Sequence, residues 1–457
     1  MNMSTYMKRA VAVAVLGVLA GCSLTPTYER PSADLPESWV DQAVAATSDS
    51  PSEWNDLFKD AELQQLMSEA LAANHDLAAA ATRIEQAKAT AKMASSRLVP
   101  YATMSVGGSR QKELNGARSL ASSDDSQLSV SYELDLWGGN RANVQAAAAR
   151  VAAREYDMES TRLVLQADVA SYYFQTLALK DRLAIAQKNL EAARSLMSLV
   201  EVRYDKGAAS GLDVAQQRTA LLNIEAEVPQ LQQSLTETQS ALALLLGRVP
   251  QDFTVRTQTL ADTQLPSIAA GQPGDLLQRR PDVRAAEADL VAANADIGVA
   301  RAALYPNMEL SATGVVTNWL TGGSASVASL AASLTQVLFA GGELRGQVQL
   351  ADASRRELVE TYLQTVLTSV KEVNDSLSAV STADQRTLLL TQTVEQAQLA
   401  LRLATTRYQA GSDDLLTVLE SQTSQLNAED SLVQARLARV NASITLFKAL
   451  GGGWSAI

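Results

Sequence analysis

The stretch 203–247 occurs twice in this chain, and this duplication limits the possible folds more than any other feature of the sequence. Shifted by 204 residues, it matches 407–451 without a gap, and 13 of 45 positions are identical. Both copies begin with an Arg-Tyr-x-x-Gly motif, which ends at Gly207 in one copy and at Gly411 in the other. The repeat predicts one architecture with internal pseudo-twofold symmetry, rather than the two or three separate domains that 457 residues would ordinarily suggest.

Each half of the chain holds two strand-like segments. Residues 128–136 alternate apolar and polar side chains without a fault, which is typical of a strand with one apolar and one polar face. The segment 101–111 is also strand-like, and the polar stretch 112–127 between the two is predicted to be a loop. The second half repeats the first strand at an offset of 206, which predicts a strand at about 307–317. A loop at 320–326 then leads to a predicted strand at about 328–338, whose end at Leu338 is the counterpart of Leu136.

Very long helices follow the strands. Residues 141–206 and 347–410 contain no Gly and no Pro over 66 and 64 residues. Each segment would be roughly 95–100 Å long if unbroken, at about 1.5 Å per residue. The returning segments 212–246 and 414–450 carry apolar residues three and four apart, which indicates a coiled-coil-like seam. The predicted fold class is therefore mainly α with a small β part.

The domain organisation follows from these elements. Each repeat is predicted to contain a helix, two strands, a long helix and a returning helix. The predicted order is a lipoprotein signal peptide at 1–21, an extended arm at 22–52, a first repeat at 53–250, a linker at 251–274 and a second repeat at 275–457.

Composition excludes several classes of function. The net charge of −12 disfavours nucleic acid, which needs concentrated Lys and Arg. One His and one Cys cannot supply a zinc cluster or a disulfide framework within one chain. His75 lies in a polar Asn-His-Asp junction, where a solvated or capping role is expected. No phosphate-binding glycine loop is present, so we expect no enzyme, no catalytic residue, no metal and no cofactor other than a covalent lipid.

The single cysteine lies at the end of a signal-like segment. A short basic region at Lys8 and Arg9 precedes an apolar core at 10–19, which is too short to span a bilayer. The following Leu-Ala-Gly-Cys sequence resembles a bacterial lipobox, in which Cys22 is lipidated and becomes the mature N-terminus. A plain secretory signal with an incidental cysteine is the alternative. No later stretch approaches 18 apolar residues, so a membrane crossing would have to use strands.

Four strands cannot form a membrane barrel by themselves, because about eight are needed for closure and lipid forbids open sheet edges. The chain must therefore oligomerise if its strands enter a membrane. Three copies would supply twelve strands.

Several motifs resemble the TolC-like outer-membrane efflux family, most closely the lipid-anchored channels of resistance-nodulation-division pumps. The resemblance covers essentially all of the chain that would follow the signal peptide. It is carried by the lipobox Cys22, the Pro-Thr-Tyr-x-Arg-Pro arm at 26–31, the segment 277–283, the Leu-Trp-Gly strand end at 136–138 and the final Gly-Gly-Gly-Trp at 451–454.

This resemblance implies a homotrimer with one shared 12-strand transmembrane β-barrel in the outer membrane. It also implies a long helical barrel in the periplasm, which narrows to an iris and docks onto an adaptor (membrane fusion) protein and an inner-membrane pump. The chain would then be the passive exit duct of a tripartite efflux pump, anchored by lipid and involved in multidrug resistance.

The resemblance also implies the residues that close the periplasmic gate. Counted from the tip turns at Gly207 and Gly411, the gate tyrosine is Tyr408 and the linking aspartate is Asp213. The apolar constriction is Leu416, with an acidic ring one helical turn later at Glu420. Two positions depart from the family pattern. Thr417 stands where some members have a second acidic residue, and Asp413 where some have an arginine.

Simpler interpretations of these residues remain open. Gly207 and Gly411 are the kind of residue that ends a helix with a positive φ angle, which is compatible with a place at the tip. Asp213 could cap the returning helix, and Tyr204 and Tyr408 could pack in a core. At the level of function, the alternatives are an exit duct for type I protein secretion and a periplasmic coiled-coil adaptor lipoprotein that never spans the membrane.

Overall fold

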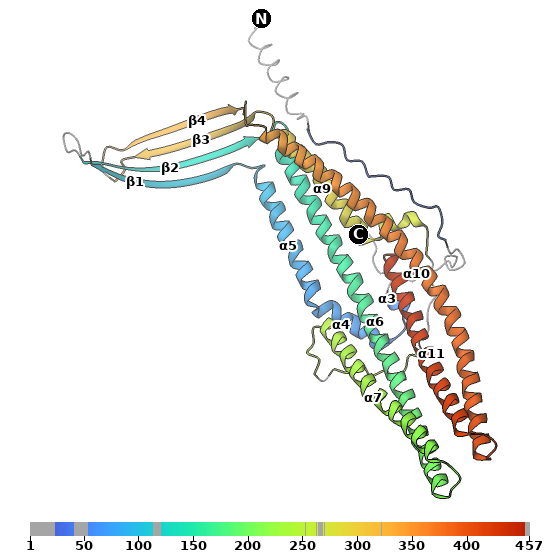
Figure 1. Cartoon of the computed structure of the whole chain (residues 1–457). Coiled ribbons are helices and arrows are strands. Elements are labelled where there is room, and N and C mark those ends of the chain that lie inside the picture. Colours follow the sequence, from blue (N-terminus) through green and yellow to red (C-terminus); the bar gives the residue numbers. More distant parts are fainter. Residues whose placement is uncertain are drawn as a thin grey trace. The chain divides into compact units, whose positions relative to one another are not determined.

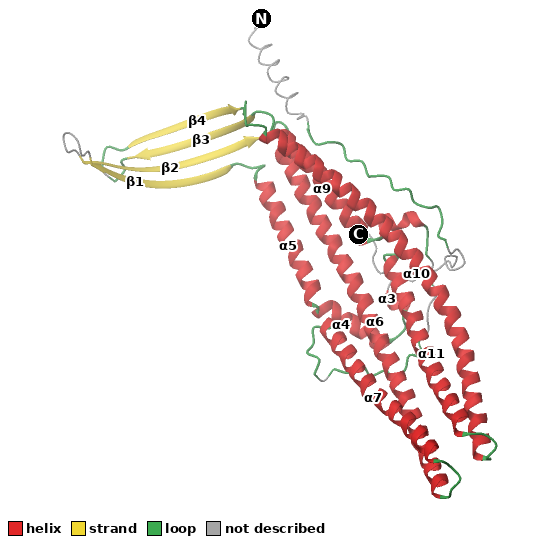
Figure 2. Ribbon diagram, in the orientation of Figure 1, coloured by secondary structure: helices red, strands yellow, loops and turns green. Residues whose placement is uncertain are grey.

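The computed structural model describes residues 23–40, 54–112, 120–251, 253–261, 263, 268, 270–320 and 322–452. The described chain consists mostly of helices, together with one four-stranded antiparallel sheet (Figures 1 and 2). This confirms the predicted class, which was mainly α with a small β part. Among the described residues, no helix is long and apolar enough to cross a membrane.

The chain divides into two compact units, and each is assembled from several stretches of sequence. Unit 1 contains the start of the arm and the sheet, and comprises residues up to 33, 81–156 and 284–365. Unit 2 contains the two helical hairpins and the main core, and comprises 34–80, 157–283 and residues from 366 onward.

The sheet of unit 1 has the strand order β1-β2-β3-β4, with antiparallel neighbours throughout. The strands are β1 (Tyr101–Lys112), β2 (Leu120–Leu134), β3 (Asn307–Thr317) and β4 (Ala325–Thr335). Successive side chains of a strand point to opposite faces. The register therefore groups Met104, Leu128, Val130, Tyr132, Leu310, Ala312 and Leu330 on one face, which we call the apolar face. The opposite, polar face carries Ser129, Ser131, Glu133, Glu309, Thr313 and Ser329.

Two strand predictions need correction. The predicted loop at 112–127 is wrong at its end, because β2 already begins at Leu120 rather than at 128. Polar residues can continue the strand here because the hydrogen bonds to β1 are made by backbone groups. Gly107, which pairs with Asp125, leaves room for the aspartate side chain, since an added Cβ on Gly107 would lie 2.9 Å from Asp125 Oδ1. The strand predicted at 328–338 is shifted by three residues at each end, since β4 spans 325–335. After the end of β4, the Gln336 side chain donates a hydrogen bond to Leu304 O.

The helix predicted to open the first repeat is interrupted twice. It consists of α3 (Trp54–Leu57), α4 (Ala61–Ala73) and α5 (His75–Ser96). Asp60 caps α4 by accepting hydrogen bonds from the N–H groups of Glu62 and Leu63. Asn74 is extended and caps α5 by accepting from Asp76 and Leu77. Short polar side chains that accept backbone hydrogen bonds favour such ends over a continuous helix.

The second repeat opens with a short 3-10 turn. The turn η1 (Pro273–Asp275) is followed by α8 (Leu276–Arg279) and by α9 (Pro281–Ala302). The long helices are unbroken. They are α6 (Gly139–Asp205) with its return α7 (Gly211–Leu245), and α10 (Glu343–Gln409) with its return α11 (Leu415–Ala449). All four lie within a few residues of the predicted segments, and α7 continues through Pro229.

The core of unit 2 is built around aromatic side chains. Tyr173 and Phe174 of α6 are fully buried, and the Phe58 ring lies 4.8 Å from that of Phe174. Trp54 meets Phe447 of α11 edge-on at the same centroid distance. The start of the first repeat and the end of the second are thus packed into one core.

The duplication is visible in individual hydrogen bonds as well as in the sequence. Asn74 Nδ2 donates to Leu245 O at the end of α7, at 3.0 Å. Arg280, the equivalent of Asn74 in the second repeat, donates from Nη1 to Ala449 O at the end of α11, also at 3.0 Å. Equivalent positions therefore close equivalent helix ends with different side chains, which confirms the internal repeat.

Two glycines complete these helix ends. Gly247 and Gly451 have φ angles of 67° and 71°, and an added Cβ would lie 2.6 Å from Ala73 O and 2.7 Å from Arg279 O respectively. By contrast, Gly411 has a φ of 75° but nothing within 4 Å of an added Cβ.

We expect Gly451→Ala to destabilise the protein more than Gly411→Ala. Both substitutions force a left-handed conformation that costs about 1–2 kcal/mol. Only Gly451→Ala also pushes a methyl group into backbone, which adds roughly 1–3 kcal/mol. Thermal unfolding of the two purified variants checks this ranking, and equal melting temperatures would contradict it.

Candidate functional site at the two helical hairpins

The two tip turns have the same backbone geometry. Gly207 and Gly411 both have a φ of 75°. The N–H groups that follow α6 and α10 bond back to the carbonyls of Arg203 and Arg407, at 2.8 and 2.9 Å. Such bonds satisfy the last carbonyls of a helix and require a left-handed residue. The sequence repeat thus places two equivalent turns between the paired helices, although their side chains differ.

Asp213 caps its own helix in this structure. Its carboxylate Oδ2 accepts hydrogen bonds from the N–H of Ser210 at 2.7 Å and from the Ser210 hydroxyl at 2.9 Å. In return, Ser210 Oγ accepts from Asp213 N at 3.2 Å, which completes a capping box. These contacts match the capping alternative that the sequence left open, and a gate role for Asp213 stays a prediction.

Tyr408 is buried in a cluster that joins the two hairpins. The tip cluster consists of the buried Val200, Ala404, Tyr408, Leu415 and Val418, with Val214 of α7 packed against it. The side chain of Tyr408 is only 5% exposed, whereas the equivalent Tyr204 is 51% exposed. The repeat therefore gives two identical tyrosines, of which only one packs between hairpins.

Arg203 bridges the two hairpins over this ring. Its guanidinium carbon lies 4.4 Å from the centroid of the Tyr408 ring, and its Nη2 donates to Gln409 O at 3.1 Å. A guanidinium over an aromatic face contributes about 0.5–2 kcal/mol. Arg203 was not among the residues predicted from sequence, although the repeated Arg-Tyr pair was the available signal.

Leu416 and Glu420 lie on the exposed side of α11. They are four residues apart and therefore on one face of the helix. The side chain of Leu416 is 48% exposed, and Glu420 is exposed as well. Together they present an apolar and an acidic group away from the tip cluster. Their roles in a constriction remain predictions, because only an assembly would bring copies of them together.

The two departures from the family pattern are bonded within their own hairpin. Asp413 pairs with Arg407 at 3.3 Å, and Thr417 Oγ1 donates to Asp414 Oδ1 at 2.8 Å. Asp414 also accepts from Thr417 N as the cap of α11, and these hydrogen bonds lower the pKa of Asp414. The second turn is thus stabilised locally by residues that the resemblance did not account for.

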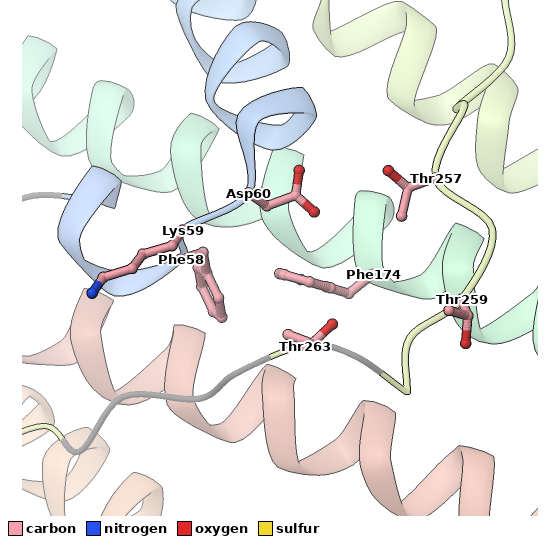
Figure 3. Close-up of a pocket in the computed structure, with 7 residues that line it drawn as sticks. All are labelled: Phe58, Lys59, Asp60, Phe174, Thr257, Thr259 and Thr263. Carbon is pink, nitrogen blue, oxygen red and sulfur yellow. The ribbon is translucent and has the colours of Figure 1, made fainter.

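A cavity of about 340 Å³ lies elsewhere in unit 2 (Figure 3). It is lined by Phe58, Lys59, Asp60, Phe174, Thr257, Thr259 and Thr263. Asp60 already accepts from the α4 backbone and, at 2.7 Å, from the Tyr173 hydroxyl. These bonds give the one carboxylate of this lining a structural role.

The loop segment beside this cavity is hydrogen-bonded to the core of unit 2. Glu62 accepts from the N–H groups of Arg256 and Thr257 at 2.7 and 2.8 Å. Burial raises the pKa of Glu62, but these bonds and the Thr257 hydroxyl lower it to a net value below the usual range. Lys180 donates to Thr257 O at 2.8 Å. These hydrogen bonds therefore hold the linker residues of the cavity wall against α4 and α6.

Cys22, the predicted lipidation site, lies outside the described residues. Within the described part of the chain, no group of three or more His, Cys, Asp or Glu side chains could hold a metal ion.

The family of this chain follows from comparison with known proteins. The profile of the family described as outer membrane efflux protein matches residues 66–248 and 273–452, one match in each repeat. The chain therefore belongs to the outer membrane efflux protein family. Like its relatives, it is an outer-membrane component of an efflux system.

Relatives and solved structures agree over nearly the whole length. The chain is 38% identical to the pyoverdine export outer membrane protein OpmQ of Pseudomonas putida, over 96% of each chain. It is 32% identical to the toluene efflux pump outer membrane protein TtgF of Pseudomonas putida, over 99% of this chain and 97% of that one.

The structure of the outer-membrane channel OprN aligns with a TM-score of 0.86 and 30% identity, over 95% of this chain and all of that one. The open state of the Neisseria gonorrhoeae MtrE outer membrane channel aligns with a TM-score of 0.85 and 28% identity, over 94% of this chain and 98% of that one.

Proposed function

We propose that three copies of this chain form a passive exit duct through the outer membrane. The sheet carries the strongest support, because it has two open edges, β1 and β4, and two faces of opposite character. Lipid cannot satisfy open edges. Pairing of β4 in one copy with β1 in the next closes a barrel of twelve strands, with the apolar face toward lipid and the polar face toward the channel.

The polar face supplies an acidic lining to this duct. Glu133 of β2 lies directly opposite Glu309 of β3, and both side chains are exposed. Like charges directly opposite on a sheet destabilise it, so their placement suits a water-filled channel better than a packed interface. Threefold repetition would place six carboxylates at one level, which favours cations over anions.

The helical hairpins form the periplasmic end of the duct in this proposal. Tyr408 and Arg203 hold the hairpins of one copy together, while the exposed Leu416 and Glu420 narrow the opening where three copies meet. Asp213 contributes by fixing the start of α7. An adaptor protein and an inner-membrane pump of the resistance-nodulation-division type would open this end by binding the open state better than the closed one.

The transported compounds are small organic molecules. The relatives are named for pyoverdine export and for toluene efflux, and these names share an efflux role but no single compound. A duct without an energy source takes its direction and its selectivity from the pump.

Cys22 carries the lipid anchor in this proposal. The described residues that follow it begin with Ser23, close to Gly138, and 24–26 are held against α9. The anchor and the barrel would then hold the same chain in the outer membrane.

Two substitutions on neighbouring residues of β4 test the membrane assignment. Leu330 is 87% exposed on the apolar face, and the adjacent Ser329 is exposed on the polar face. We expect Leu330→Arg to abolish the trimer band of unheated outer-membrane extracts, because arginine facing lipid costs about 2–4 kcal/mol at mid-membrane. Ser329→Arg, which faces the channel, should leave the trimer intact.

The same strains report on transport. A strain without the gene should retain a fluorescent pump substrate, and wild type and Ser329→Arg should restore its release while Leu330→Arg does not. Equal tolerance of both arginines would contradict the membrane assignment and favour a periplasmic adaptor. Normal dye release with loss of a secreted protein would instead favour type I secretion.

A further inference from the structure

The apolar face of the sheet contains a hollow of about 430 Å³. Ala312 of β3 pairs with Val130 on one side and with Leu330 on the other, and Ala332 pairs with Leu310. Ala312 ends at Cβ between two larger neighbours and Ala332 beside one, so the face is indented at this point. The lining is completed by Pro100, Tyr132 and the edges of Ser311 and Ala331, and contains no charged residue.

The arm that follows Cys22 packs against α9 and runs antiparallel to it. Asn294 Nδ2 donates to Pro26 O at 2.7 Å, and Arg301 Nη1 donates to Leu24 O at 3.4 Å. Between them, an added Cβ on Gly298 would lie 2.1 Å from Thr25 Oγ1 and 2.9 Å from Thr25 Cα, so only glycine admits the arm. We call Asn294, Gly298 and Arg301 the arm seat. The arm runs opposite to α9, and its N-terminal end therefore points toward the start of β3.

The first described residue of the arm, Ser23, lies beside the turn between β2 and α6. An added Cβ on Gly138 would be 3.6 Å from Ser23 Cα. The neighbouring Trp137 donates to Pro306 O at 2.8 Å and stacks on Tyr305, which ties the segment after β2 to the segment before β3. Ser23 thus lies at the end of the sheet at which the hollow lies.

The distances are compatible with an acyl chain. Gly138 follows Tyr132 of the hollow by six residues, so the two are at most about 20 Å apart. An acyl chain covers one leaflet, about half of the roughly 30 Å hydrocarbon core. The chain length, about 15 Å, is of the same order as the largest separation between Gly138 and Tyr132, so a lipid attached at residue 22 has a length suited to the near side of the hollow.

We propose that an acyl chain carried by Cys22 fills this hollow, so that the protein's own lipid forms part of the outer wall of the barrel. The inference rests on the lipidation of Cys22 proposed above. A tethered chain competes favourably with free phospholipid, because tethering turns binding into an intramolecular step with a high effective concentration. The arm seat raises that concentration by fixing residues 24–26.

The test uses the full-length protein in cells fed a fatty acid that carries a photoreactive diazirine and an alkyne. After irradiation, purified trimers are digested and cross-linked peptides are identified by mass spectrometry. We expect the N-terminal peptide to be joined through its acyl chain to peptides of β2, β3 or β4 that contain hollow residues. Only a tethered lipid can join two peptides, whereas free phospholipid adds lipid to one.

Two variants serve as controls. Ala312→Phe fills the hollow with an apolar group and should reduce these peptide pairs several-fold while trimers still form. Cys22→Ser, exported by a signal peptide of the non-lipoprotein type, should remove the pairs although its membrane contains the same labelled lipid.

The remaining outcomes overturn the inference in different ways. Hollow peptides joined to free lipid, with the acyl chain of Cys22 attached elsewhere, would show that bulk lipid occupies the hollow. Absence of acyl label on the N-terminal peptide would refute lipidation itself, and the inference with it, without touching the proposed duct.

Discussion

Replacing Tyr408 by alanine should loosen the two hairpins and give trimers with a several-fold larger conductance. The buried ring fills the tip cluster and lies under Arg203, so its removal leaves a cavity and a guanidinium without its aromatic face. Loss of a buried aromatic side chain costs about 3–5 kcal/mol. Hydrogen exchange should be faster in 401–419 than in wild type, and conductance in planar bilayers reports the opening.

Tyr408→Phe separates packing from hydrogen bonding. Phenylalanine keeps the ring beneath Arg203 and loses only the hydroxyl. If packing holds the hairpins, Tyr408→Phe should conduct like wild type. If a hydroxyl link to a neighbouring copy holds the gate, as the family resemblance implies, Tyr408→Phe should conduct as much as Tyr408→Ala. Unchanged conductance in both variants would remove Tyr408 from the gate.

Replacing Arg280 by methionine should lower the free energy of unfolding by about 3 kcal/mol. Arg280 is 8% exposed and donates to Ala449 O, to both carboxylate oxygens of Asp282 and to Glu372. Burial lowers the pKa of Arg280, but these carboxylates raise it overall, so the charge is held firmly. Methionine fills similar space but leaves the helix-end carbonyl of Ala449 without its donor.

Two further substitutions define the cause of this loss. Arg280→Lys keeps the charge but cannot form the paired contacts with Asp282, so it should recover only part of the stability. Arg439→Met breaks an exposed ion pair with Asp384 and should cost no more than about 1 kcal/mol. Equal losses for Arg280→Met and Arg439→Met, measured by denaturant unfolding of the detergent-solubilised protein, would contradict the buried-network explanation.

The repeat made most of the fold predictable from sequence, and for a physical reason. Long segments without Gly or Pro specify helices through local propensity, and strict alternation specifies strands through burial of one face. The start of β2 escaped prediction, because at 120–127 the polar side chains carry no alternation and the ladder depends on backbone pairing with β1. The junction at Asn74 was recognised from its polar residues, whereas the break at Asp60 was missed because it arises from a side-chain cap.

The site was less predictable than the fold. Sequence placed Gly207 and Gly411 at turns, where both have positive φ angles. It could not show that Tyr408 is buried while Tyr204 is exposed, since the two share one motif and differ in the side chains packed around them. Arg203 was missed for the same reason. The assignments of Asp213, Leu416 and Glu420 rest on the family resemblance and stay predictions.

Single-channel conductance in a planar bilayer tests the central claim most directly. Purified wild-type protein should insert and give a small conductance that favours cations. A Leu416→Ala, Glu420→Ala double variant should conduct more with weaker cation preference, because both the constriction and its charge are removed. A double variant identical to wild type would place the gate elsewhere. If neither protein conducts, the chain does not form a membrane duct, and the proposed function is wrong.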